Sequence, residues 1–118
     1  MVMQEKIQGI RAHFSTSDFR GTRQELWFDR QEAAEQGERV LRAVFAQAHI
    51  GLRALPKELK ILPTDTQPCN VKHRSKDGLY AIVQGGPSPG YGLLFEVPAA
   101  RKRHVSDIIC DLAPHISR

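Results

Sequence analysis

The residues best suited to chemistry in this 118-residue chain are three cations, Arg101, Lys102 and Arg103. They stand at the start of "VPAARKRHVSDIICDLAPHI", residues 97–116, where an apolar pattern with helical spacing begins. Cations in the first turn of a helix oppose the helix dipole and the free N–H groups there. A phosphate or carboxylate would relieve that conflict, so the stretch predicts an anion-binding site. The alternative is a solvated helix end, in which exposed cations cost only tenths of a kcal/mol.

A second basic cluster occupies "VKHRSK", residues 71–76. On a strand, Lys72 and Arg74 share one face and Val71 and His73 share the other. This arrangement suits a strand that contacts phosphates, as in β-ribbon readers of DNA. The alternative is an edge strand whose Lys and Arg discourage pairing with other chains.

Aromatic residues are sparse, at 7% of the chain, and we take Trp27 and Tyr91 as the candidate anchors for a partner or ligand. Tyr91 belongs to "GGPSPGYG", residues 85–92, which fits neither a dinucleotide-binding nor a Walker loop because it joins two strands. The loop is either an irregular hairpin connection or a flap that gates a ligand pocket.

Little in the sequence supports a metal site or a catalytic site. The Cys and His spacing invites a zinc site made of Cys69, His73, His104 and Cys110. However, the last two residues point about 120° apart on a helix. The first two lie about 13 Å apart on a strand. We therefore expect no metal, no cofactor and two reduced thiols, and no catalytic motif argues for an enzyme.

Hydrophobic periodicity places these residues on elements. "GIRAHF" alternates apolar and polar residues, and "TRQELWF" sets Glu25 and Trp27 on the face opposite Leu26; together they predict a hairpin. "DRQEAAEQGERVLRAVFAQAHIG" predicts a helix with Asp29 as N-cap and Gly51 as its C-terminal stop. Gly37 inside that helix predicts close packing against another element, since glycine weakens a helix.

The remaining segments complete the fold. "CNVKHR", "LYAIV" and "YGLLFEV" predict three strands, while residues 52–68 are either one short strand around Leu59 and Ile61 or irregular chain. The order ββα(β)βββα predicts one α+β domain over residues 1–118, two-layered, with a largely antiparallel sheet of about five strands and two helices. Glu96 interrupts an apolar strand, so on a covered face it needs an ion pair, for which Arg101 or Arg103 is the expected partner.

Two helices barely cover both faces of a sheet whose "LYAIV" and "LLFEV" strands are apolar on both sides. A homodimer that buries the second face is therefore expected. The composition, 41% apolar and 25% charged, is that of a globular protein, and no apolar run is long enough for a membrane span. The start of the chain lacks the pattern of a secretion signal, from which we expect a cytoplasmic protein.

The net charge of +4 is spread over the chain and mildly favours acidic partners. We therefore expect a small non-enzymatic binding module whose basic face holds nucleic acid or an acidic protein surface. The alternative is a small-molecule binder or minor enzyme with a pocket gated by residues 85–92. A basic surface that joins the two clusters would favour the first function, and a pocket with titratable groups of shifted pKa would favour the second. A large exposed apolar patch would instead indicate a structural subunit.

Overall fold

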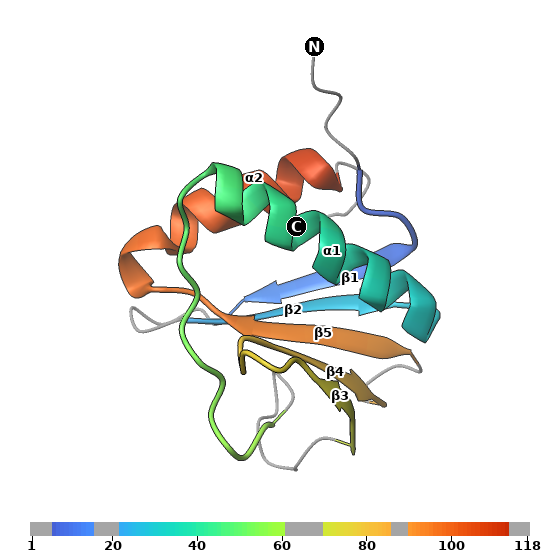
Figure 1. Cartoon of the computed structure of the whole chain (residues 1–118). Helices are drawn as coiled ribbons and strands as arrows, with labels where there is room; N and C mark the ends of the chain where they lie inside the picture. Colours follow the sequence, from blue (N-terminus) through green and yellow to red (C-terminus); the bar gives the residue numbers. More distant parts are fainter. Residues whose placement is uncertain (1–5, 16–21, 61–69, 86–89, 114–118) are drawn as a thin grey trace.

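The protein folds as an α+β structure in which two helices lie on one face of a five-stranded antiparallel sheet (Figure 1). The computed structural model describes residues 6–15, 22–60, 70–85 and 90–113. In chain order the elements are β1 (Ile10–Ser15), β2 (Arg23–Phe28), α1 (Gln31–Gln47), β3 (Asn70–Arg74), β4 (Tyr80–Gln84), β5 (Tyr91–Glu96), the 3-10 helix η1 (Ala99–Arg101) and α2 (Lys102–Leu112). The strands lie in the order β1-β2-β5-β4-β3, so the fold class predicted from the sequence is confirmed.

The first hairpin forms as predicted, but a bulge changes the face of its residues. The register between β1 and β2 shifts between Ile10 and Ala12. Ile10 consequently packs into the core under the helices, whereas Ala12 pairs with Trp27 and packs on the opposite face of the sheet. The expected single apolar face of β1 is therefore split between the two sides.

The helix-covered face holds the larger core. Leu26, Phe28, Leu93 and Phe95 from β2 and β5 are fully buried there with apolar residues of both helices. At Gly37 of α1 an added Cβ would lie 2.7 Å from Cζ of Phe28, so only a glycine lets the helix approach the ring this closely. The close packing predicted for this residue is confirmed.

The second face is covered by the chain itself, through an irregular segment of residues 53–60 that we call the strap. In Figure 1 the strap, drawn in green, descends from the end of α1 and passes to the side of the sheet that faces away from the helices. Leu55 and Leu59 of the strap pack there with a small buried cluster. The other members of this cluster are Trp27, Ala81, Val83 and Leu94. The strap covers this part of the second face, and the homodimer stays a prediction.

The ends of both helices differ from the sequence prediction. Arg30, not Asp29, is the N-cap of α1 and makes no side-chain capping bond; Asp29 forms an ion pair with Arg11 at 3.2 Å instead. The helix stops at Gln47, and His49 with φ +57° takes the left-handed conformation expected of Gly51. None of the helices in the ranges described above is both long and apolar enough to cross a membrane.

Candidate anion-binding surface at one end of the sheet

Strand register brings the two basic clusters of the sequence to the same end of the sheet. Arg74 at the end of β3 pairs with Ala81, which in turn pairs with Leu94 of β5. The β3–β4 turn therefore projects beyond the sheet at the end where Glu96 closes β5 and the chain continues into η1 and α2. With neighbouring strands about 4.8 Å apart, the ends of β3 and β5 lie about 10 Å from each other. The two clusters are 25 or more residues apart in sequence but share one edge of the molecule.

The strap bridges these two strand ends. The Arg53 N–H donates to the Glu96 carbonyl at 3.0 Å, and the Leu55 N–H donates to the Gly78 carbonyl at 2.9 Å. Its residues consequently run from the end of β5 to the β3–β4 turn, as Figure 1 shows on the left of the molecule. This path places the exposed side chains of Arg53 and Lys57 at the same end as the two clusters.

We call this surface the basic end. It comprises Arg53, Lys57, Arg74, Lys76, Arg101, Lys102 and Arg103. All are exposed except Lys102, which is half-buried. The sequence prediction missed Arg53 and Lys57, since neither belongs to a motif and only the path of the strap places them here.

Glu96, which closes β5 at the basic end, is already engaged, whereas Glu58 of the strap is an exposed carboxylate. Glu96 accepts from Arg23 Nε at 2.8 Å and from Thr22 Oγ1 at 2.6 Å, and the paired side chains of Arg23 and Glu96 are 12% and 13% exposed. An ion pair for Glu96 was predicted, but Arg101 and Arg103 are not its partners. In the described part of the chain, neither guanidinium forms an ion pair, so both are available to an external anion.

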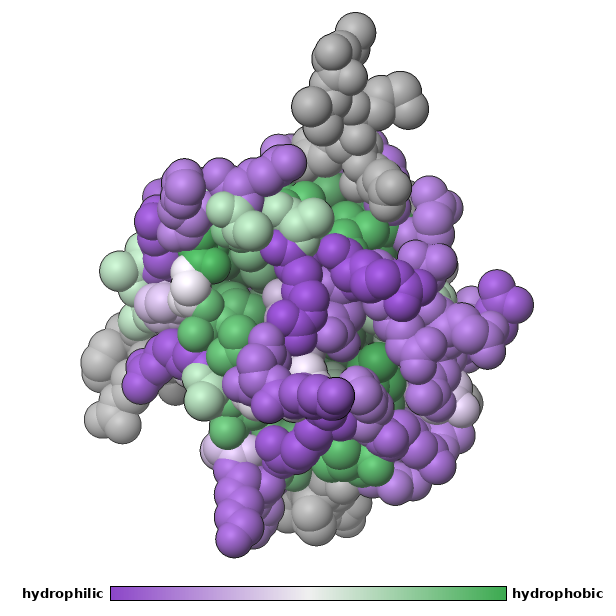
Figure 2. Space-filling view, viewed as in Figure 1, coloured by the Kyte–Doolittle hydropathy of each residue, from purple (hydrophilic) through white to green (hydrophobic). Residues whose placement is uncertain are grey.

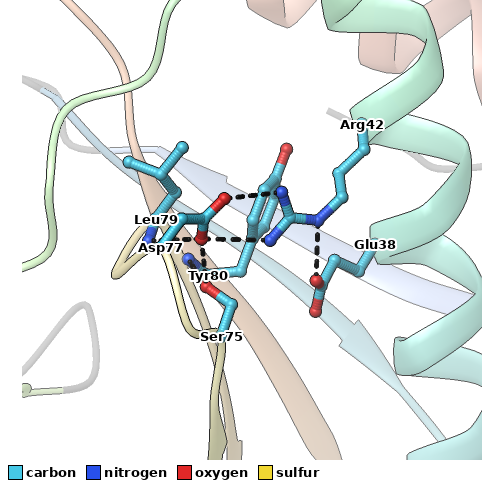
Figure 3. A network of polar contacts seen from close by, with 6 residues as sticks. All are labelled: Glu38, Arg42, Ser75, Asp77, Leu79 and Tyr80. Atoms are coloured by element: carbon cyan, nitrogen blue, oxygen red, sulfur yellow. Dashed lines mark hydrogen bonds and ion pairs between the residues drawn. The ribbon is translucent and has the colours of Figure 1, made fainter.

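A second network occupies the flank of the basic end (Figure 3). Arg42 of α1 binds Asp77 of the β3–β4 turn through both terminal nitrogens, at 2.8 and 3.2 Å, and Glu38 through Nε at 2.9 Å. Its guanidinium also stacks 4.5 Å above the Tyr80 ring. Hydrogen bonds from Arg42 and Ser75 lower the pKa of Asp77, and burial raises the pKa of Tyr80. The network clamps the turn to α1 and satisfies the carboxylate of Asp77.

Within the second basic cluster, the roles of the side chains differ from the prediction. A bulge in β3 between Val71 and His73 interrupts the alternation of faces. His73 pairs with Ile82 of the helix-covered face, whereas Val71 pairs with Val83 of the strap-covered face, so the two do not share a face. Lys72, at the bulge, is exposed.

Arg74 is exposed, but its guanidinium already has protein acceptors. Nη2 donates to the carbonyl of Lys57 at 2.7 Å and to that of Pro56 at 3.1 Å. The side chain therefore fastens the strap to β3, and its charge still contributes to the basic end. The all-exposed strand β3 also fits the alternative weighed for this cluster, an edge strand protected by cations and a bulge.

The two aromatic anchor candidates lie away from the basic end. Trp27 is 5% exposed, packs against the Cα of Gly92, and donates through Nε1 to Glu25 Oε1 at 2.8 Å. It is a core residue, which corrects its assignment as an anchor for a partner or ligand, and Glu25 beside it is fully buried. Tyr91 is half-buried at the opposite end of the sheet, where its hydroxyl accepts from Gln84 Nε2 at 3.2 Å.

A hollow of about 410 Å³ also lies at that opposite end, between residues 6–9 and the first half of α1. None of the described residues of the 85–92 loop lines it, so it is not the pocket that the sequence predicted. The central part of that loop, residues 86–89, lies outside the described residues, as does Cys69. Among the residues that the structure does describe, no group of three or more His, Cys, Asp or Glu side chains is arranged to hold a metal ion.

Comparison of the chain with models of protein families, with curated proteins and with solved structures finds no match. The chemistry of the surface is therefore what indicates a function.

Proposed function

We propose that this protein is a small non-enzymatic binding module whose basic end holds an anionic partner, either nucleic acid or an acidic protein surface. The observation that supports this function is the gathering of exposed cations from the strap, the β3–β4 turn and the start of α2 at one end of the sheet. The neighbouring carboxylates of Glu96 and Asp77 are held by Arg23 and Arg42, so they do not neutralise these cations.

The start of α2 strengthens the positive potential. The first turn of α2 contains no acidic residue, and its N-cap, Arg101, makes no side-chain capping bond. Arg101 and Arg103 present guanidinium groups that can bind a phosphate or carboxylate through two parallel hydrogen bonds. Partner binding through such groups is governed by charge and therefore weakens with salt.

The exposed surface favours contacts to charged groups over stacking on bases. Phe14 is the one aromatic side chain among the large hydrophobic residues exposed in the described ranges, and it belongs to β1, across the sheet from β3. Aromatic platforms are what single-strand binders use. Figure 2 shows, on the face in view, hydrophilic side chains interspersed with apolar ones.

The test is a fluorescence-anisotropy titration with labelled duplex DNA, duplex RNA and an acidic peptide, at low and near-physiological salt. We expect binding that weakens steeply with salt, and each substitution of a cation that binds a phosphate should reduce the slope of log K against log [salt] by about 0.9 on duplex DNA. The test variants are Arg53→Ala and the double variant Arg101→Ala/Arg103→Ala. Arg39→Ala, which removes an exposed cation of α1 outside the basic end, is the matched control.

Loss of affinity in the basic-end variants with an unchanged Arg39→Ala protein would support the proposal. No binding of any probe at low salt, or equal weakening in all variants, would contradict it.

The homodimer and the cytoplasmic location stay part of the proposal, and light scattering after gel filtration measures the oligomeric state directly.

A further inference from the structure

The hollow beside α1 has the size and the walls of a small-molecule site. Its volume of about 410 Å³ lies within the range of about 300–1,000 Å³ that is usual for ligand pockets. One wall is the first half of α1, and the other is the segment of residues 6–9 that leads into β1 (Figure 1). The hollow is distinct from the basic end, which lies at the far end of the sheet.

Hydrogen bonds fix the wall formed by residues 6–9. The Ile7 N–H donates to the Leu112 carbonyl at 3.0 Å, and Lys6 Nζ donates to the Asp111 carbonyl at 2.7 Å. Both acceptors belong to the last residues of α2, so this helix holds the segment in place. A wall held at two points is preformed, which lowers the entropy lost when a ligand binds.

The lining combines an apolar base with a positively charged rim. Ile7, Ala33 and Val40 supply apolar surface, of which Ile7 is buried and the other two are half-buried. The charged lining residues are Lys6, Arg30 and Glu32, which leave one net positive charge; the amides of Gln8 and Gln36 complete the rim.

Arg30 is the charged group best placed to meet a ligand. Its side chain is exposed at the amino end of α1 and, in the ranges described here, has neither an ion pair nor a capping bond. Lys6 is already bound to Asp111, so its ammonium is less free to move toward a ligand. A guanidinium above an apolar base matches a molecule with a carboxylate at one end and a compact apolar body.

We propose that this hollow binds a small organic acid, with its apolar body against Ala33 and Val40 and its carboxylate on Arg30. This site goes beyond the proposed function, since it shares no residue with the basic end and takes a small molecule instead of a macromolecular partner. The Arg30 contact supplies the selectivity for an acid, and the apolar base supplies the affinity for its body.

The experiment is a titration of the ¹⁵N-labelled protein with 3-phenylpropionate, followed by amide chemical shifts, with the neutral 3-phenylpropanol as a comparison. We expect saturable shifts at residues 6–9 and 30–40, with a Kd of about 1 mM. The neutral alcohol should bind several-fold more weakly, because it cannot form the charge-assisted hydrogen bonds with Arg30.

Arg30→Ala should weaken the binding of 3-phenylpropionate only about two- to fivefold, because an exposed ion pair is screened by water. Gln36→Trp, which places a bulky ring at an exposed position on the rim, should weaken it as well. Arg39→Ala, an exposed cation of α1 that does not line the hollow, should bind like the parent protein, as should Arg53→Ala of the basic end.

Several results would overturn the proposal: no saturable shift up to about 10 mM, shifts that map elsewhere, equal affinity for the alcohol, or an Arg30→Ala protein that binds as before. Because Arg53→Ala tests the basic end alone, failure of this site and failure of the proposed function give different results.

Discussion

Replacing Gly37 by alanine should destabilise the protein, although alanine is the better helix former. The added Cβ would lie 2.7 Å from Cζ and 3.3 Å from Cε2 of Phe28, whereas carbon atoms normally pack at about 3.5–4.0 Å. Phe28 has no exposed surface and belongs to the core under the helices. Either the ring or α1 must shift within the core.

The expected magnitude is the difference between two opposing effects. Overpacking a well-packed core costs about 1–3 kcal/mol. Removing a glycine from a helix interior gains about 1 kcal/mol. We therefore expect a net loss of about 1 kcal/mol in the free energy of unfolding, which corresponds to a fall in Tm of about 4 °C for a chain of this size.

Urea denaturation followed by the fluorescence of the buried Trp27 measures this loss. Gly51→Ala is the matched control, because no atom lies within 4 Å of the added Cβ and the chain there is exposed. It should leave stability unchanged or raise it by about 0.5 kcal/mol. A double-mutant cycle with Phe28→Leu isolates the contact, since Gly37→Ala should cost less beside the smaller side chain. A Gly37→Ala protein at least as stable as the parent, or an absence of coupling with Phe28, would refute the reasoning.

Two further predictions concern the ion pairs around the basic end. Asp77→Asn removes the carboxylate held by Arg42 and should lower the free energy of unfolding by about 0.5–1 kcal/mol at neutral pH, since the pair is partly exposed. Because the pKa of Asp77 is lowered in the folded state, its contribution is complete above about pH 4 and is lost as the pH falls through the lowered value. The difference in the free energy of unfolding between the parent protein and Asp77→Asn, measured by urea denaturation, should therefore narrow toward pH 2. A difference independent of pH would contradict this cause. Asp107→Asn, at an exposed position, is the control. Glu96→Gln leaves the largely buried charge of Arg23 without its carboxylate and should lower the free energy of unfolding by about 2 kcal/mol in the same assay. A loss below about 0.5 kcal/mol, which is the ordinary effect of a surface substitution, would show that the ion pair contributes little to stability.

The candidate site was only partly predictable from the sequence. Runs such as "ARKRH" and "VKHRSK" identify the cations of two clusters, because charge density is a local property of the chain. That the clusters lie at one end of the sheet depends on the placement of β5 between β2 and β4. The same placement pairs Glu96 with Arg23, 73 positions apart, and no local pattern identifies such a partner.

Burial of polar and aromatic residues was the other failure of the sequence prediction. Period-two alternation correctly placed Glu25 and Trp27 on the face opposite Leu26, but alternation does not say what covers a face. The strap covers that face, and its irregular chain with three prolines nearby has no periodicity that would predict a covering segment.

The sequence by itself determined the helices, the strands and the fold class, because most elements are stabilised by apolar residues spaced two or three to four positions apart; β3, which is exposed throughout, is the exception. Tertiary structure alone decided the caps of α1, the partner of Glu96, the burial of Trp27 and the membership of Arg53 in the basic end. These features depend on contacts between segments far apart in the chain, which form only when the strand order and the path of the strap are set.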